Sequence, residues 1–180
     1  MKKLTFLFVA FLCLNLHSTS QTVLESDSLA LVAFYNATDG PNWNNNTGWL
    51  VPGTPVSQWY GIELENNRVI SFDLPGNNMT GEIPLALSEL TELRFMHFGH
   101  NNFTGDIPDF LCSLPLEVVN FEKNRLEENC GSIQCLLDKN VEFAEDPWQR
   151  QQDGTSLFEP CGIIPAAEPV LEQDSLALVA

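Results

Sequence analysis

The hydrophobic pattern between residues 69 and 126 repeats with a period of about 24 residues. In each unit the apolar positions are separated by three, two and then five residues. The apolar residues of the three units are Val69, Phe72, Leu74, Met79 and Ile83, then Leu93, Met96, Phe98, Phe103 and Ile107, and finally Leu116, Val119, Phe121 and Leu126. This spacing predicts one short strand per unit with its side chains in a core, so that successive strands pair in parallel.

Polar and turn-forming residues keep the same period. The recurring asparagines are Asn77, Asn101 and Asn124. A buried amide at this position can hydrogen-bond the backbone of adjacent coils, so we expect a structural asparagine ladder. The glycines and prolines at Gly81, Pro84, Gly105 and Pro108 favour a return path without regular strands, which predicts an irregular or 3₁₀ convex side. The pattern stops in the third unit, at Glu128.

The full motif, L-x-x-L-x-L-x-x-N-x-L-x-G-x-I-P, resembles the plant-type leucine-rich repeat, which also occurs in exported bacterial proteins. The resemblance covers about residues 22 to 128. It implies an α/β fold: a short leucine-rich-repeat solenoid with a parallel concave sheet, an irregular or 3₁₀ convex side, and an N-terminal cap made of a helix and a hairpin. We assign about three repeats to residues 69–128.

Three further segments carry a second resemblance: residues 27–35, then Asp39-Gly40-Pro41-Asn42-Trp43, then Trp49 with Trp59-Tyr60-Gly61-Ile62. They resemble the N-terminal cap of the bacterial members of this family, which we assign to residues 21–68. A helical spacing of apolar residues follows Asp27, which we interpret as the helix N-cap. Further on, Glu65-Asn66-Asn67 separates two strand-like segments and predicts a hairpin. The cysteines that plant relatives carry in this cap are missing here, so we expect the cap to depend on apolar packing.

The N-terminus predicts export. Lys2 and Lys3 precede an apolar run from Leu4 to Leu14, which is typical of a signal peptide over residues 1–20. The run is too short to cross a hydrocarbon core of about 30 Å. We therefore expect a secreted or cell-surface protein with no transmembrane segment in the mature chain.

Four cysteines remain after the signal peptide, most of them in a C-terminal cap that we assign to residues 129–162. They are Cys112, Cys130, Cys135 and Cys161. An even number in an exported chain predicts two disulfides, for which three pairings are possible. Zinc is disfavoured because no Cys-x-x-Cys knuckle is present. We expect no metal and no cofactor.

A second, longer period links the two ends of the sequence. Residues 23–33 return at 170–180, displaced by 147, with one difference, Gln173 for Ser26. We predict that residues 163–180 are a Pro- and Ala-containing linker followed by the start of a second cap-like repeat. The protein would then continue in further repeat modules; the alternative is a final helix with a role of its own.

Charge limits the expected partners. The chain has 180 residues with 24 Asp and Glu against 8 Lys and Arg, giving a formal net charge of −16. Such a surface repels phosphate backbones and anionic headgroups, which argues against nucleic acids and acidic membranes. Basic proteins, cations and neutral glycans remain possible partners. The hydrophobic fraction of 44% is sufficient for a packed core.

Side chains between the inward apolar positions point out of the concave face, and there we expect ligand binding. The candidate residues are Asp73, Arg94, Phe95, His97, His100, Glu117, Val118 and Asn120. An exposed aromatic ring surrounded by charged side chains is suited to binding a protein or a sugar. His97 and His100 with Asp73 suggest a metal site or a general base, but we expect the two histidines to point in different directions.

We conclude from the sequence that this is a binding or adhesion module and not an enzyme. It would recognise a protein or a surface glycan through its concave face. One alternative is a structural spacer or assembly unit of a tandem surface protein, without a ligand of its own. A less favoured alternative is an accessory module of a polysaccharide-active enzyme.

Overall fold

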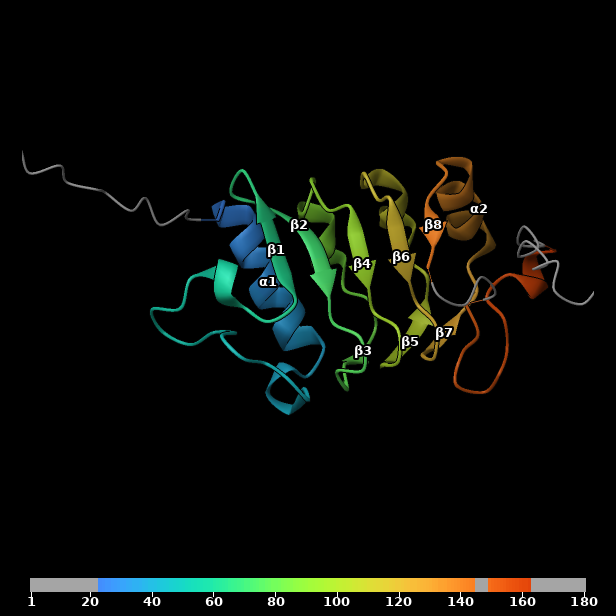
Figure 1. Ribbon diagram of the computed structural model, residues 1–180. Helices are drawn as coiled ribbons and strands as arrows, with labels where there is room; N and C mark the ends of the chain where they lie inside the picture. The colour runs from blue at the N-terminus through green and yellow to red at the C-terminus, as the bar shows by residue number, and fades with distance from the viewer. Residues whose placement is uncertain (1–22, 145–148, 163–180) are drawn as a thin grey trace, which may run out of the picture.

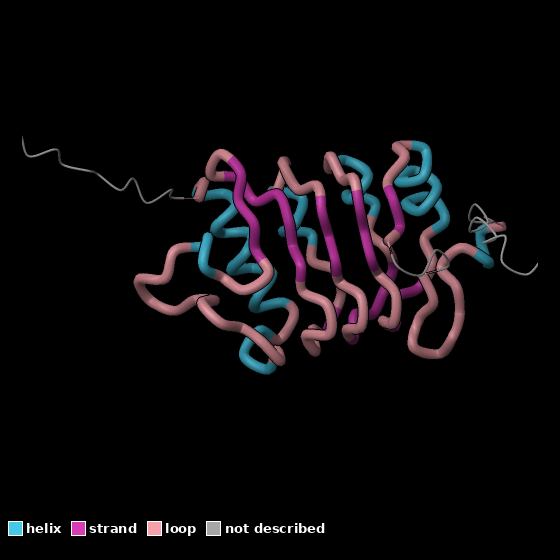
Figure 2. Tube along the Cα trace, viewed as in Figure 1, coloured by secondary structure: helices cyan, strands magenta, loops and turns pink. Residues whose placement is uncertain are grey.

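The computed structural model describes residues 23–144 and 149–162, which wind into a short stack of coils (Figure 1). In this part of the chain the principal sheet has the order β1-β2-β4-β6-β8. β1 and β2 form an antiparallel hairpin, and the later strands are parallel. The strands are β1 (Ile62–Glu65), β2 (Arg68–Asp73), β4 (Phe95–His97), β6 (Val118–Asn120) and β8 (Glu142–Phe143). Figure 2 shows the helical segments behind this sheet.

The repeated apolar positions form one continuous core. Val69, Phe72 and Leu74 of the first unit have no solvent exposure, and the corresponding residues of the second unit are equally buried. Burying an aliphatic or aromatic side chain of this size contributes roughly 1.5–3 kcal/mol. Each coil therefore depends on its neighbours for most of its stability.

Buried side-chain amides form hydrogen bonds with the backbone N–H and carbonyl groups of adjacent coils. Asn101 Nδ2 donates to the carbonyl oxygens of Leu74, Phe98 and Gly99 at 2.9–3.1 Å. Its Oδ1 accepts from the N–H groups of Asn77 and Met79. Asn124 repeats the arrangement one coil later, donating to Phe98, Phe121 and Glu122 and accepting from Phe103. Asn77 exchanges hydrogen bonds with the backbone of Asn45.

Glutamines continue this series into the C-terminal segment. Gln151 Oε1 accepts from the N–H of Leu126 at 3.0 Å, the bond that Met79 and Phe103 make to asparagines. Gln149 Oε1 accepts from the N–H of Phe121 at 2.6 Å. Both glutamines are buried. The motif search missed them because they lie outside the repeat spacing and have a longer side chain than asparagine.

The N-terminal helix α1 (Glu25–Ala37) lies against the first repeats. Its Phe34 ring contacts those of Phe72 and Phe98, at centroid distances of 5.0 and 5.4 Å. Two 3₁₀ helices, η1 (Gly40–Asn42) and η2 (Val56–Gln58), follow α1. The tryptophans of this region, Trp43, Trp49 and Trp59, are buried, and Trp49 contacts Trp43 edge to face and Trp59 at a tilt. Aromatic packing thus closes this end of the core.

The expectation that Asp27 is the helix N-cap is wrong. The helix begins at Glu25, so the cap residue is Leu24, three residues before Asp27, and it makes no side-chain cap bond. Asp27 is instead fully buried and accepts from Arg68 Nε at 3.0 Å and from the N–H of Val69 at 2.9 Å. The hydrogen bond to Asp27 raises the pKa of Arg68, against an opposing effect of desolvation. Asp27 therefore ties α1 to the first residues of β2.

The return segments contain more regular structure than the sequence predicts. The 3₁₀ helices η3 (Leu85–Glu89) and η4 (Asp109–Ser113) start after Pro84 and Pro108, as the convex side should. A small second sheet, in the order β3-β5-β7, was not expected. Its strands are β3 (Thr80–Gly81), β5 (Asn102–Asp106) and β7 (Arg125–Glu127). They lack an alternating pattern, and they pair because stacking places equivalent backbones side by side.

The cysteine-containing segment adds a helix α2 (Cys130–Asp138), strand β8 and the 3₁₀ helix η5 (Glu159–Cys161). Cys112 pairs with Cys135, which ties η4 to α2. Cys130 pairs with Cys161, which ties the start of α2 to η5. The two covalent loops therefore overlap. The signal peptide over residues 1–20 and the linker and second cap-like repeat over 163–180 lie outside the described residues.

The asparagine ladder predicts a large difference between two neighbouring residues. Replacing Asn101→Ala removes five hydrogen bonds to buried backbone groups, so the free energy of unfolding should fall by about 3–5 kcal/mol. The control Asn102→Ala removes a surface amide and should cost no more than about 1 kcal/mol. Urea unfolding of both variants measures this, and equal losses would contradict the proposed role.

The disulfide pairing gives a second prediction. Tandem mass spectrometry of non-reduced peptides, with fragmentation between Cys130 and Cys135, should assign Cys112 to Cys135 and Cys130 to Cys161. Fragmentation is needed because trypsin leaves Cys130 and Cys135 in one peptide. A Cys112–Cys130 bond would contradict the structure.

Candidate functional site

Three rows of side chains cross the strands of the concave sheet. The register aligns Glu63, Ser71, Phe95, Val118 and Glu142 in one line, named here the Phe95 row. Asp73, His97 and Asn120 are aligned in the His97 row. Gly76, His100 and Lys123 follow at the strand ends and form the His100 row. Neighbouring strands are about 4.8 Å apart, so adjacent members of a row can contact one ligand.

The Phe95 row is apolar in its centre and acidic at its ends. Phe95 and Val118 are half-buried, Ser71 is buried, and Glu63 and Glu142 are exposed. Phe95 and Val118 are there because the sequence places apolar residues at outward positions of β4 and β6. A partly exposed aromatic ring beside a valine offers a contact surface for another apolar group.

Arg94 lies over this centre. Its guanidinium carbon is 5.6 Å from the centroid of the Phe95 ring. Nη2 is 2.7 Å from Glu65 Oε2, and Nη1 is 3.9 Å from Glu117 Oε1. These are solvent-exposed pairs worth at most about 1 kcal/mol each, so they orient Arg94 more than they stabilise the fold. Arg94 thus contacts Phe95 and the two carboxylates of Glu65 and Glu117.

The His97 row differs from the expectation at one position. His97 Nδ1 is 3.5 Å from Asp73 Oδ1, and its Nε2 is buried with no hydrogen-bond partner among the described residues. Asn120, expected to face a ligand, is only 2% exposed. Its Oδ1 accepts from the N–H of Glu122 at 2.9 Å, because the side chain folds back over Gly99, where a Cβ would come within 2.8 Å. Asn120 therefore shapes the face and does not extend from it.

The His100 row has a backbone constraint that the sequence does not reveal. Gly76, His100 and Lys123 all have left-handed backbones, with φ of 62°, 59° and 52°. A residue with a Cβ costs roughly 1 kcal/mol there relative to glycine. The first repeat uses glycine at this position, whereas the next two carry an imidazole and an ammonium group.

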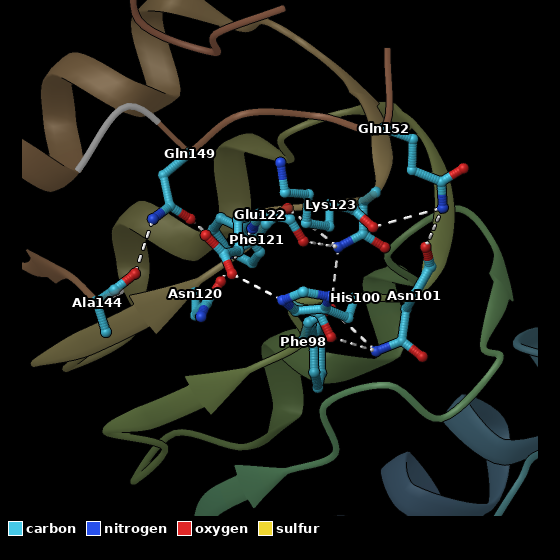
Figure 3. Close-up of polar contacts among 12 residues, drawn as sticks. Phe98, His100, Asn101, Asn120, Phe121, Glu122, Lys123, Ala144, Gln149 and Gln152 are labelled. Carbon is cyan, nitrogen blue, oxygen red and sulfur yellow. Dashed lines mark hydrogen bonds and ion pairs between the residues drawn. The ribbon is translucent and has the colours of Figure 1, made fainter. Parts of the chain in front are cut away.

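His100 has a nearly buried carboxylate as its partner. Figure 3 shows the Nε2 of His100 and the Oε1 of Glu122, which are 2.9 Å apart. The Glu122 side chain is 9% exposed, whereas the His100 side chain is 56% exposed. A shallow pocket of about 330 Å³ opens beside them and is lined by His100, Asn101, Asn102, Lys123 and Gln152. His97 and His100 therefore belong to separate pairs and form no joint site.

Sequence reasoning missed Glu122 and Gln152. Glu122 occupies the repeat position held by Pro75 and Gly99, and this departure was the only available signal. Gln152 comes from the irregular C-terminal segment, and its Nε2 donates to the carbonyl of Asn101 at 2.7 Å. Within residues 23–144 and 149–162, no three His, Cys, Asp or Glu side chains form a group that could hold a metal ion. No helix in the same part of the chain is long and apolar enough to cross a membrane.

Comparison with known proteins supports the repeat architecture. A family model described as Leucine Rich Repeat matches residues 92–114. The fold is a leucine-rich-repeat solenoid. The ectodomain of BIR2 from Arabidopsis thaliana is similar in structure, with a TM-score of 0.56 and 22% identity, over 72% of this chain and 70% of that one. A chain of the BIR3–SERK2 complex from the same plant gives a TM-score of 0.52 at 25% identity, over 61% and 63% of the two chains.

Sequence similarity leads to the same group of proteins. A probable inactive receptor kinase of Arabidopsis thaliana is 31% identical over 102 residues, which is 56% of this chain. The chain spans only 15% of the length of that kinase. The similarity is thus to leucine-rich-repeat ectodomains of plant receptors.

The left-handed backbone in the His100 row leads to a test at Lys123. Lys123→Gly should raise the free energy of unfolding by about 0.5–1 kcal/mol relative to Lys123→Ala, because glycine removes the steric cost at φ 52°. Both variants lose the ammonium group, so the difference between their free energies of unfolding reports the cost of the left-handed backbone at this position. Thermal or urea unfolding measures it, and an alanine variant as stable as the glycine variant would contradict the prediction.

Proposed function

We propose that this chain is a protein-binding module that recognises its partner through the concave sheet. The observation that carries the proposal is the half-buried pair Phe95 and Val118 in the middle of that sheet, with Arg94 stacked on the ring. Aromatic and arginine side chains at the centre of a surface supply most of the energy of protein–protein recognition. Asp73, His97, His100, Lys123 and Glu117 form the polar surroundings.

The comparisons support a protein as the partner class. One structural relative is part of a complex between two proteins, BIR3 and SERK2. A surface glycan is the less favoured ligand, because the face is a shallow sheet whose apolar centre carries a single aromatic ring. The shared ectodomain fold is also the reason to propose binding in place of catalysis.

We also propose that the protein is of the exported bacterial type and is secreted to the cell surface or the medium. Two disulfides are typical of proteins that fold in an oxidising compartment. The N-terminal helix and hairpin act as a cap for the stack, and the sequence repeat at 170–180 indicates further modules of the same protein. A module that serves only as a spacer in such an array would have no ligand on its concave face.

A selection experiment tests the proposal. Phage-displayed random peptides of 16 residues are selected on the disulfide-bonded chain, and a glycan array is probed in parallel. The double variant Phe95→Ala with His97→Ala should weaken binding of the selected peptides at least tenfold while the domain stays folded by circular dichroism. The control Leu85→Ala with Glu89→Ala changes exposed residues of η3 on the convex side and should bind normally.

Three outcomes would overturn the proposal. If the selected peptides bind the concave-face double variant and the control variant equally, the concave face is not the binding surface. Failure to select any peptide would favour the alternative in which the module is a spacer without a ligand. Selective binding of array glycans alone would show that the ligand is a sugar and not a protein.

A further inference from the structure

The concave face has a strong local imbalance of charge. Carboxylates surround the apolar centre at Glu63, Glu65, Asp73, Glu117 and Glu142, all of them exposed. Arg94 already pairs with Glu65 and Glu117, and Arg68, which is in register with Glu65, pairs with Asp27 and Glu92. The face is thus acidic beyond what its own cations balance.

The arrangement of these acids is as informative as their number. Glu63 and Glu142 lie on the two outermost strands of the sheet, at the ends of the Phe95 row, with the apolar pair between them. Four strand spacings of about 4.8 Å separate them by roughly 19 Å. A polyproline II segment advances about 3.1 Å per residue with three residues per turn, so six residues cover this distance and every third side chain lies on the same face.

We propose that the partner segment is cationic and in a polyproline II conformation, with basic residues about six positions apart and an apolar side chain midway between them, all three on the same face of the segment. This inference rests on the proposed function, because it specifies what the concave face binds. The central side chain packs on Phe95 and Val118, and the flanking cations face Glu63 and Glu142.

Long-range electrostatics acts in the same direction. The whole chain carries a formal charge of −16, so a basic segment is attracted before contact and an acidic one is repelled. Salt screens this attraction, since the Debye length falls from about 10 Å at 0.1 M to about 3 Å at 1 M. Binding should therefore weaken with salt much more than apolar contact alone allows.

The probes are four synthetic peptides of one length: KSSFSSK, QSSFSSQ, ESSFSSE and KSSASSK. Dissociation constants come from NMR titration of the amide signals of β4 and β6 at 50 mM and 500 mM NaCl. KSSFSSK should bind about tenfold more tightly than QSSFSSQ at low salt, with ESSFSSE weakest. Most of that advantage should be lost at high salt, and KSSASSK should bind more weakly than KSSFSSK at both salt concentrations.

Two double variants that remove the same number of charges show which carboxylates cause the preference for the basic peptide. Glu63→Gln with Glu142→Gln should remove the preference for KSSFSSK over QSSFSSQ, whereas Glu82→Gln with Glu89→Gln, on exposed return-segment positions, should leave at least half of it. A preference lost equally in both would assign it to net charge and overturn the specific row. Tighter binding of ESSFSSE or QSSFSSQ through Phe95 would overturn this inference but leave the proposed function intact, whereas insensitivity of all selected peptides to Phe95→Ala with His97→Ala would overturn both.

Discussion

Buried backbone groups are the constraint on which the rest of this structure depends. A solenoid turns sharply in every coil, and each turn leaves amide and carbonyl groups inside the stack without strand partners. An unpaired buried group costs about 1–3 kcal/mol. One carboxamide per coil solves this, since Asn101 and Asn124 each bind carbonyl and N–H groups of their own coil and its neighbour. The parallel pairing of β2, β4, β6 and β8 follows from coils fixed in this register.

The same constraint explains how an irregular C-terminal segment can end the ordered repeats. Beyond Glu128 the motif is lost, yet the last coil still presents backbone groups that need partners. Gln149 and Gln151 reach them from a different chain path, and the disulfides hold that path against α2 and η4. Covalent loops of 23 and 31 residues restrict the unfolded chain by an amount worth about 3–4 kcal/mol each. The cross-links therefore replace what the missing repeat pattern no longer supplies.

The predictability of each feature from sequence follows from how local its cause is. The strands and the asparagine positions depend on spacing within one coil, so the repeat pattern identifies them. Asp27 was misassigned because its partner, Arg68, is 41 residues away and nothing nearby indicates a buried ion pair. Asn120 follows the outward pattern of its strand, but Gly99 in the neighbouring coil leaves room for it to fold inward. The partners Glu122 and Gln152 were missed for the same reason, since coil stacking brings them to the site.

Several residues of the candidate site are not the ones that would make the fold most stable. At the left-handed turns the first coil has Gly76, which is the least strained residue, while the next two coils carry His100 and Lys123 at a steric cost. On the strands, carboxylates gather around Phe95, although like charges on neighbouring strands repel one another. Neither choice improves packing, since the core beneath is already filled by Phe72, Met96 and Val119. Residues that oppose stability on one face of a well-packed scaffold support the proposal of a partner on that face, and the acidic rim around an apolar centre is the reason for proposing a basic one.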